Sequence, residues 1–146
     1  MRVLLGIICI LFGLLSWGGQ TVSAFFFKFA QRIGLQETDE GTDPLYREVE
    51  RQAARWDALI LWPLVIAGVL MVMGHPWWPV AGLLSAGIYL DTAGRELAKG
   101  AGLRRQGVRT GSAADTRKAF VLFGIMIALA LILFAYSAMA LARTCG

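Results

Sequence analysis

The chain contains few of the residues on which redox and metal chemistry depend. It has one histidine, His75, and two cysteines, Cys9 and Cys145, among 146 residues. A single histidine excludes a haem held by two histidines. The cysteines are too far apart in the sequence for a Cys-x-x-Cys redox motif, so we expect Cys9 to be a small buried hydrophobe and Cys145 a free thiol. The sequence therefore predicts no cofactor and no metal site.

Other catalytic signatures are also missing. No combination of serine, histidine and aspartate indicates a nucleophilic site. The stretch "GVRTGS" at 107–112 lacks the spacing and the lysine of a phosphate-binding P-loop. We expect neither nucleotide nor nucleic acid as a partner. The sequence favours a protein without catalysis of its own.

Hydrophobic residues, in contrast, are abundant. They make up 57% of the chain, and the mean hydropathy is +0.60, well above that of ordinary soluble domains. Apolar runs reach the roughly 20 residues that a spanning helix needs, although the third run, Trp77–Leu90, is short. The composition predicts an all-α integral membrane protein in one domain with four transmembrane helices. The predicted spans are 3–27, 56–73, 77–98 and 119–142.

The basic residues orient these spans. Five lie in the first predicted loop, and seven lie between the third and fourth apolar runs. Because loops rich in Lys and Arg stay in the cytoplasm, both long loops should be cytoplasmic and both termini outside (N-out/C-out). A signal peptide ending at Ala24 is the alternative for the first run, but its removal would export both basic loops. The expected location is the bacterial cytoplasmic (inner) membrane.

Local signals organise the first cytoplasmic segment, residues 28–55. Asp43 before Pro44 is a typical N-cap and first helical residue, so a helix should start there and run directly into the second span as a cytoplasmic extension. Its apolar stripe, Leu45, Val49, Ala53 and Trp56, should lie on the membrane surface or on a neighbouring loop. Pro63 should then kink the helix.

The other two connections differ in length and charge. Residues 74–77, within "GHPWWP", predict a tight external hairpin with tryptophans in the headgroup region. Residues 99–118 form a basic cytoplasmic loop in which Ser112 and Asp115 fit a capping box. We expect Arg104, Arg105 and Arg109 in that loop to contact the headgroups of anionic membrane lipids.

Four polar residues are candidates for a buried site. Asp57 and Arg95 are each 19 residues from Pro76, so they should lie at similar depth on neighbouring helices. Asp91 is four residues before Arg95, and therefore near it on the same helix. A lone carboxylate at such depth costs several kcal/mol and normally finds a partner. We therefore predict a cluster of Asp57, Asp91 and Arg95, which Gln20 of the first span could join.

This cluster is open to two interpretations. It is either a structural network that fixes helix register or a substrate or proton site. Gly18 and Gly19 in the first span should permit close helix packing. The preferred function is an accessory, assembly or stabilising subunit, as a homo-oligomer or in a larger membrane complex. The alternative is a small dimeric transporter that uses Asp91 and Arg95 at the inner leaflet.

Overall fold

The described chain folds into an elongated bundle of helices. The computed structural model describes residues 1–37 and 39–145, except for the side chains of residues 144 and 145. No β-strand occurs in these ranges. The helices are α1 (Arg2–Phe25), α2 (Phe27–Arg32), the 3-10 turn η1 (Asp39–Gly41), α3 (Pro44–Ile60), α4 (Pro63–Met73), α5 (Trp78–Arg105) and α6 (Ala113–Cys145).

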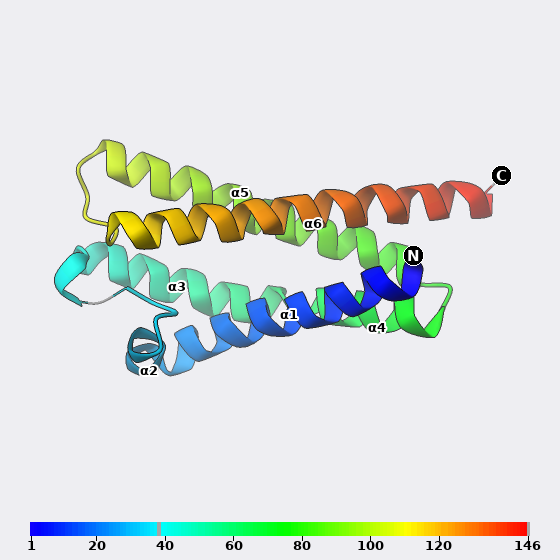
Figure 1. Ribbon diagram of the computed structural model, residues 1–146, viewed down its shortest axis with the longest axis horizontal. Coiled ribbons are helices and arrows are strands. Elements are labelled where there is room, and N and C mark those ends of the chain that lie inside the picture. Colours follow the sequence, from blue (N-terminus) through cyan, green and yellow to red (C-terminus); the bar gives the residue numbers. More distant parts are fainter. Residues whose placement is uncertain (38, 146) are drawn as a thin grey trace.

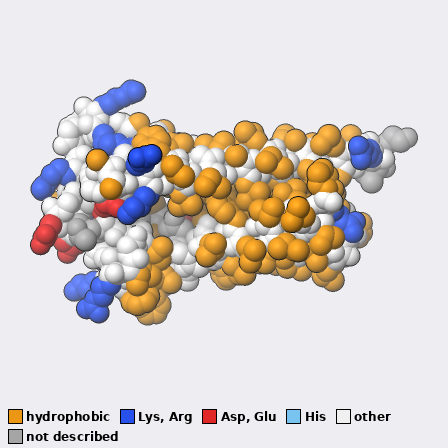
Figure 2. Space-filling view, viewed as in Figure 1, with side chains coloured by type: hydrophobic (Ala, Val, Ile, Leu, Met, Phe, Trp, Pro, Cys, Tyr) orange, Lys and Arg blue, Asp and Glu red, His pale blue; other side chains and the backbone are white. Residues whose placement is uncertain are grey.

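Helices α1, α5 and α6 lie along the long axis of the bundle (Figure 1). The consecutive helices α3 and α4 together form a fourth element along the same axis. Helix α1 packs on α3 and α4, α4 packs on α5, and α5 packs on α6. The two chain ends and the α4–α5 turn lie at one end of the bundle, and the two long connections lie at the other. Figure 2 shows most of the charged side chains of this face at the end with the long connections, beside a broad hydrophobic surface.

Within the described residues, three helical segments are long and apolar enough to cross a membrane. They are Arg2–Phe25, Pro44–Met73 and Ala113–Arg143. Their surfaces are strongly apolar, with Leu15 and Leu59 more than 60% exposed, which is the pattern expected of side chains that face lipid. Helix α5 has the length of a span, at 28 residues, but its second half is too polar for it to qualify.

Two predicted helix starts and the predicted kink are confirmed. Asp43 accepts a hydrogen bond from the Leu45 amide, and Ser112 accepts one from the Asp115 amide. The helix that starts at Pro44 is interrupted at Leu61 and Trp62 and resumes at Pro63, because proline has no amide hydrogen to continue the backbone ladder. The apolar stripe of α3 does not pack on a loop, since Leu45 is 74% exposed.

Glycines set the closest helix crossings, but not the predicted ones. Gly6 of α1 and Gly68 of α4 face each other so closely that a Cβ on Gly68 would lie 2.6 Å from the Gly6 carbonyl oxygen. Gly82 of α5 meets Ser137 of α6 in the same way. Around Gly18 and Gly19, by contrast, the space for a side chain is open, so no other described helix packs closely there. Sequence shows which glycines exist but not which side of the helix meets a neighbour.

The two long connections are joined to each other. Thr42 and Thr110 form an isolated antiparallel bridge, and the Asp43 amide donates to the Arg109 carbonyl at 2.9 Å. The Glu37 carboxyl packs against Gly111, whose φ is +110°. Burial, together with the nearby Asp115 carboxylate, raises the pKa of Glu37 to about 7. The bundle is therefore closed at this end by a cap built from both connections.

The Gly6–Gly68 crossing predicts a clear stability effect. Gly68→Ala should destabilise the protein by about 1–3 kcal/mol, because the added methyl group forces α1 and α4 apart. Thermal unfolding in detergent micelles measures this effect. Gly124→Ala on α6, where the space is open, is the matched control and should change the melting temperature little. Equal melting temperatures for the two variants would contradict the crossing.

Candidate functional site

Acidic residues of α3 and basic residues of α5 form a line of ion pairs near the capped end of the bundle. An Arg95 guanidinium nitrogen lies 3.0 Å from the Asp57 carboxylate. The Lys99 ammonium group lies 2.8 Å from Glu50 and 2.5 Å from Glu96. We call these five residues, Glu50, Asp57, Arg95, Glu96 and Lys99, the charge row.

Helical spacing explains how the charge row is assembled. Glu50 and Asp57 are seven residues apart, about two turns, so both project from the same side of α3. Arg95 and Lys99 are four residues apart on α5 and also share a side. Because α5 runs back along α3, each base meets one acid of α3, and Glu96 of α5 lies beside Lys99 as a second acid. Asp57 is 1% exposed, and a carboxylate buried to this degree needs a charged or hydrogen-bonding partner.

The other two predicted members do not join this row. Asp91 is exposed, and no hydrogen bond or ion pair connects it to another described residue. The buried face of α5 is centred on Tyr89, Thr92 and Ala93, so the short side chain of Asp91 points away, whereas the long Arg95 side chain reaches across to Asp57. Gln20 is half-buried on α1 and makes no hydrogen bond within the described residues. The four-residue spacing put Asp91 near Arg95 and depth put Gln20 at the same level, but neither argument showed which side of each helix faces α3.

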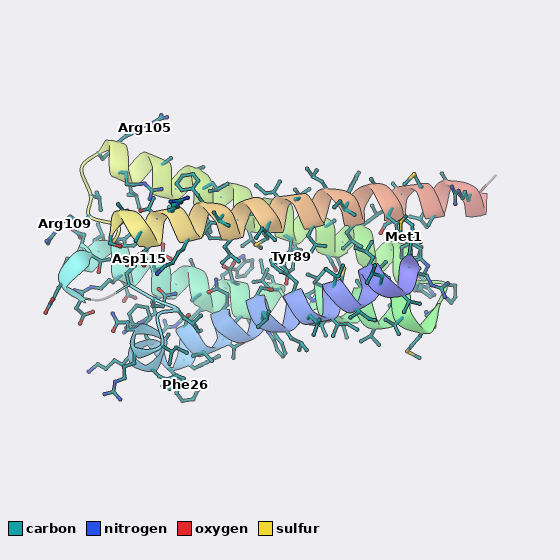
Figure 3. All side chains as sticks on the ribbon, viewed as in Figure 1. Met1, Phe26, Tyr89, Arg105, Arg109 and Asp115 are labelled. Carbon is teal, nitrogen blue, oxygen red and sulfur yellow. The ribbon has the colours of Figure 1, made fainter. Side chains whose placement is uncertain are left out.

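The three arginines expected at lipid headgroups differ in their surroundings. Arg105 and Arg109 are exposed at the capped end (Figure 3). Arg104 instead donates a hydrogen bond to the Thr116 hydroxyl at 2.8 Å, and its guanidinium lies 5.1 Å from the centre of the Phe120 ring. Arg104 thus links α5 to α6, while Arg105 and Arg109 are free to meet headgroups.

A second polar arrangement surrounds the interruption before Pro63. The indole nitrogen of Trp17 donates to the Ala58 carbonyl at 2.8 Å. The Tyr89 hydroxyl donates to the Leu61 carbonyl at 3.2 Å and lies 2.7 Å from the Ser16 hydroxyl. Figure 3 shows Tyr89 in the interior of the bundle. Side chains of α1 and α5 therefore donate hydrogen bonds to two carbonyls beside the interruption. At such a break, some backbone groups lack a partner within the helix.

Sequence reasoning missed this arrangement although a signal was present. Trp17 and Tyr89 each place a polar atom inside a predicted span, away from the headgroup level where such side chains are usual. A buried indole or phenol normally has a hydrogen-bond partner. A proline about two turns into the neighbouring span offers carbonyl acceptors for both. The combination of these three residues was the available clue.

The described residues offer no candidate metal site. They contain no group of three or more His, Cys, Asp or Glu side chains that could hold a metal ion. Comparison of the chain with family models, curated proteins and solved structures finds no match. The inferences about function therefore rest on the geometry of this chain.

The charge row predicts a non-additive response to substitution. Arg95→Gln should destabilise the protein by about 2–3 kcal/mol, less than the roughly 3–5 kcal/mol of a fully buried pair because Arg95 is 38% exposed. Adding Asp57→Asn should recover much of this loss, because the unpaired charge is then removed. A double-mutant cycle in chemical unfolding measures the coupling. Simple additivity would show that the two side chains do not interact.

The polar contacts at the helix interruption predict a smaller effect. Tyr89→Phe should cost about 1 kcal/mol, because it leaves the Leu61 carbonyl without this donor. Tyr136→Phe is the control, since Tyr136 stacks on Trp78 through its ring and no described residue accepts a hydrogen bond from its hydroxyl. Thermal unfolding of both variants in the same detergent compares them. A loss for Tyr136→Phe as large as that for Tyr89→Phe would count against the proposed contact.

Proposed function

We propose that this protein is a four-span membrane protein with both basic connections in the cytoplasm and both chain ends outside. In this proposal α5 also crosses the membrane, in addition to the three apolar segments. It runs alongside α6 for much of its length (Figure 1), and its first half exposes apolar residues such as Leu84. The long connections lie together at one end of the bundle, as the charge rule requires of two cytoplasmic loops. A bacterial inner membrane is the expected setting.

Within this arrangement, we infer that the chain acts as an accessory, assembly or stabilising subunit. The observation that carries this inference is the unpaired carboxylate of Asp91. Asp91 is about 20 Å from Trp78 along α5 at about 1.5 Å per residue, and so within a hydrocarbon core of about 30 Å. A charged side chain there costs roughly 2.5–3.5 kcal/mol unless another group compensates it. A basic or hydrogen-bonding group from a second chain would do so.

The surface around Asp91 suits another helix. Exposed positions follow each other along one side of α5: Val80, Leu84, Gly87, Asp91, Gly94 and Ala98. The space around Gly87 and Gly94 is open, and small residues in such a row permit close approach of a second backbone. We call this set the open face of α5.

The charge row, in contrast, supports a structural role. Its acids and bases are paired with each other across α3 and α5. Two pockets of the described structure, one at each end of the bundle, are lined by other residues. Arg95 is engaged by Asp57 and is not shared with Asp91, which weakens the alternative of a transporter that uses Asp91 and Arg95 together.

Purification in a mild detergent tests the subunit proposal. The wild-type protein should be recovered with a stoichiometric second chain or a second copy of itself, as measured by light scattering and mass spectrometry. Asp91→Leu and Gly87→Leu should each release the monomer. Gly124→Leu on α6, also in open space, is the control and should leave the complex intact.

Three results would contradict the proposal. One is a wild-type monomer in mild detergent. Another is loss of the complex with Gly124→Leu as well, which would show a general effect of bulk. The third is an Asp91→Asn variant that keeps its assembly but loses solute or proton flux in proteoliposomes, which would support the transporter.

A further inference from the structure

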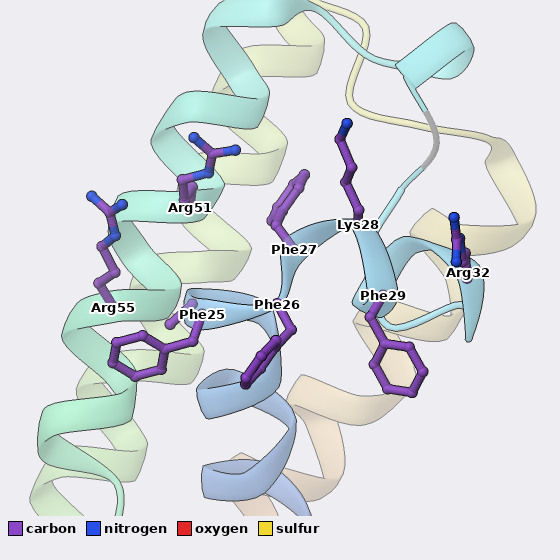
Figure 4. Close-up of a pocket in the computed structure, with 9 residues that line it drawn as sticks. Phe25, Phe26, Phe27, Lys28, Phe29, Arg32, Arg51 and Arg55 are labelled. Carbon is purple, nitrogen blue, oxygen red and sulfur yellow. The ribbon is translucent and has the colours of Figure 1, made fainter.

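A pocket of about 490 Å³ lies beside the junction of α1 and α2 (Figure 4). Phenylalanines of the run 25–29 form one part of its lining, and four basic side chains form another. The basic side chains are Lys28, Arg32, Arg51 and Arg55. We call this the phenylalanine–arginine pocket. It contains none of the residues of the charge row or of the open face of α5.

The backbone at Phe26 creates the pocket. Helix α1 ends at Phe25, Phe26 adopts φ −128° and ψ 51°, and α2 starts again at Phe27. This interruption turns neighbouring phenylalanines in different directions (Figure 4). Phe25 is 71% exposed and Phe26 65% exposed. Such exposure of large aromatic rings is costly in water but favourable against acyl chains.

The charge of the pocket is unbalanced. No acidic residue belongs to its lining. Arg51 has Glu48 at 3.6 Å and lies 5.2 Å from the centre of the Phe27 ring. Lys28, Arg32 and Arg55 have no ion pair with any described residue. The pocket therefore combines an apolar surface with several cations that are available to an anion.

We propose that the phenylalanine–arginine pocket binds an anionic phospholipid of the cytoplasmic leaflet. Arg51, Arg55 and Lys28 hold the phosphate, and an acyl chain lies along Phe25 and Phe26. The proposal rests on the four-span arrangement, which places the inner end of α1 at the headgroup level. It differs from the general headgroup contact expected of Arg105 and Arg109, because it requires charge and apolar surface in one pocket.

Lipid binding to the purified chain tests this proposal without any partner. Short-chain phosphatidylglycerol and phosphatidylcholine are titrated into protein in neutral micelles, and native mass spectrometry counts the lipid retained. The wild type should prefer phosphatidylglycerol. Lys28→Gln with Arg51→Gln should weaken phosphatidylglycerol binding by about tenfold or more, since two basic residues that contact the headgroup are lost.

Matched variants separate a pocket from a charged surface. Arg105→Gln with Arg117→Gln removes the same charge from exposed positions elsewhere and should weaken binding less than about twofold. Lys28→Arg with Arg51→Lys keeps the charge and should retain the preference. Equal losses in the two charge-removing variants, or equal binding of both lipids by the wild type, would overturn the proposal. Neither result depends on the oligomeric state, so failure here is distinguishable from failure of the subunit proposal.

Discussion

The hydrogen bonds and ion pairs that α5 makes to its neighbours are the interactions on which the rest of the structure depends. Tyr89 donates to the Leu61 carbonyl, Arg95 pairs with Asp57, and Lys99 pairs with Glu50. All three partners lie on the helical stretch from Pro44 to Met73 or at its interruption. Inside a bilayer, polar groups without such partners cost several kcal/mol each. The polar and charged side chains that make α5 too polar to qualify as a span by composition include those that pair with Leu61, Asp57 and Glu50.

The interruption before Pro63 determines where two of the polar contacts form. A straight helix from Pro44 to Met73 would use its carbonyls in its own hydrogen bonds and leave none for its neighbours. Interrupted at Leu61 and Trp62, it exposes acceptors that Trp17 of α1 and Tyr89 of α5 bind. The Gly6–Gly68 crossing then brings α1 against α4 on the other side of the interruption. Together these contacts define how α1, the consecutive pair α3 and α4, and α5 are placed relative to one another.

Sequence reasoning predicted the local features of the fold and part of the site. Asp43–Pro44, Pro63 and Ser112–Asp115 carry signals within a few residues of the structure they produce, and the structure confirms all three. Equal distance from Pro76 placed Asp57 and Arg95 at one depth, and the structure brings their side chains together. Asp91 was placed by its four-residue spacing from Arg95 and Gln20 by its depth in the first span, but neither argument identifies the side of the helix that faces α3, and neither residue contacts the charge row.

The missed features depend on contacts between distant segments. The pairing of Gly6 with Gly68 needs the crossing point of two helices, which no local pattern gives. The phenylalanine–arginine pocket needs the change of backbone direction at Phe26 together with arginines of α3.

The chain thus has two separate regions of interest. One is the open face of α5 with Asp91, and the other is this pocket at the C-terminal end of α1.

The arrangement of α5 as a fourth span is the central claim, and labelling from the two sides of the membrane tests it most directly. In a background with Cys9→Ser and Cys145→Ser, single cysteines are introduced by His75→Cys, before α5, and Gln106→Cys, after it; both positions are exposed. A membrane-impermeant maleimide applied from outside should label His75→Cys in intact cells, and Gln106→Cys only after permeabilisation. Labelling of both positions from the same side would mean that α5 does not cross the membrane.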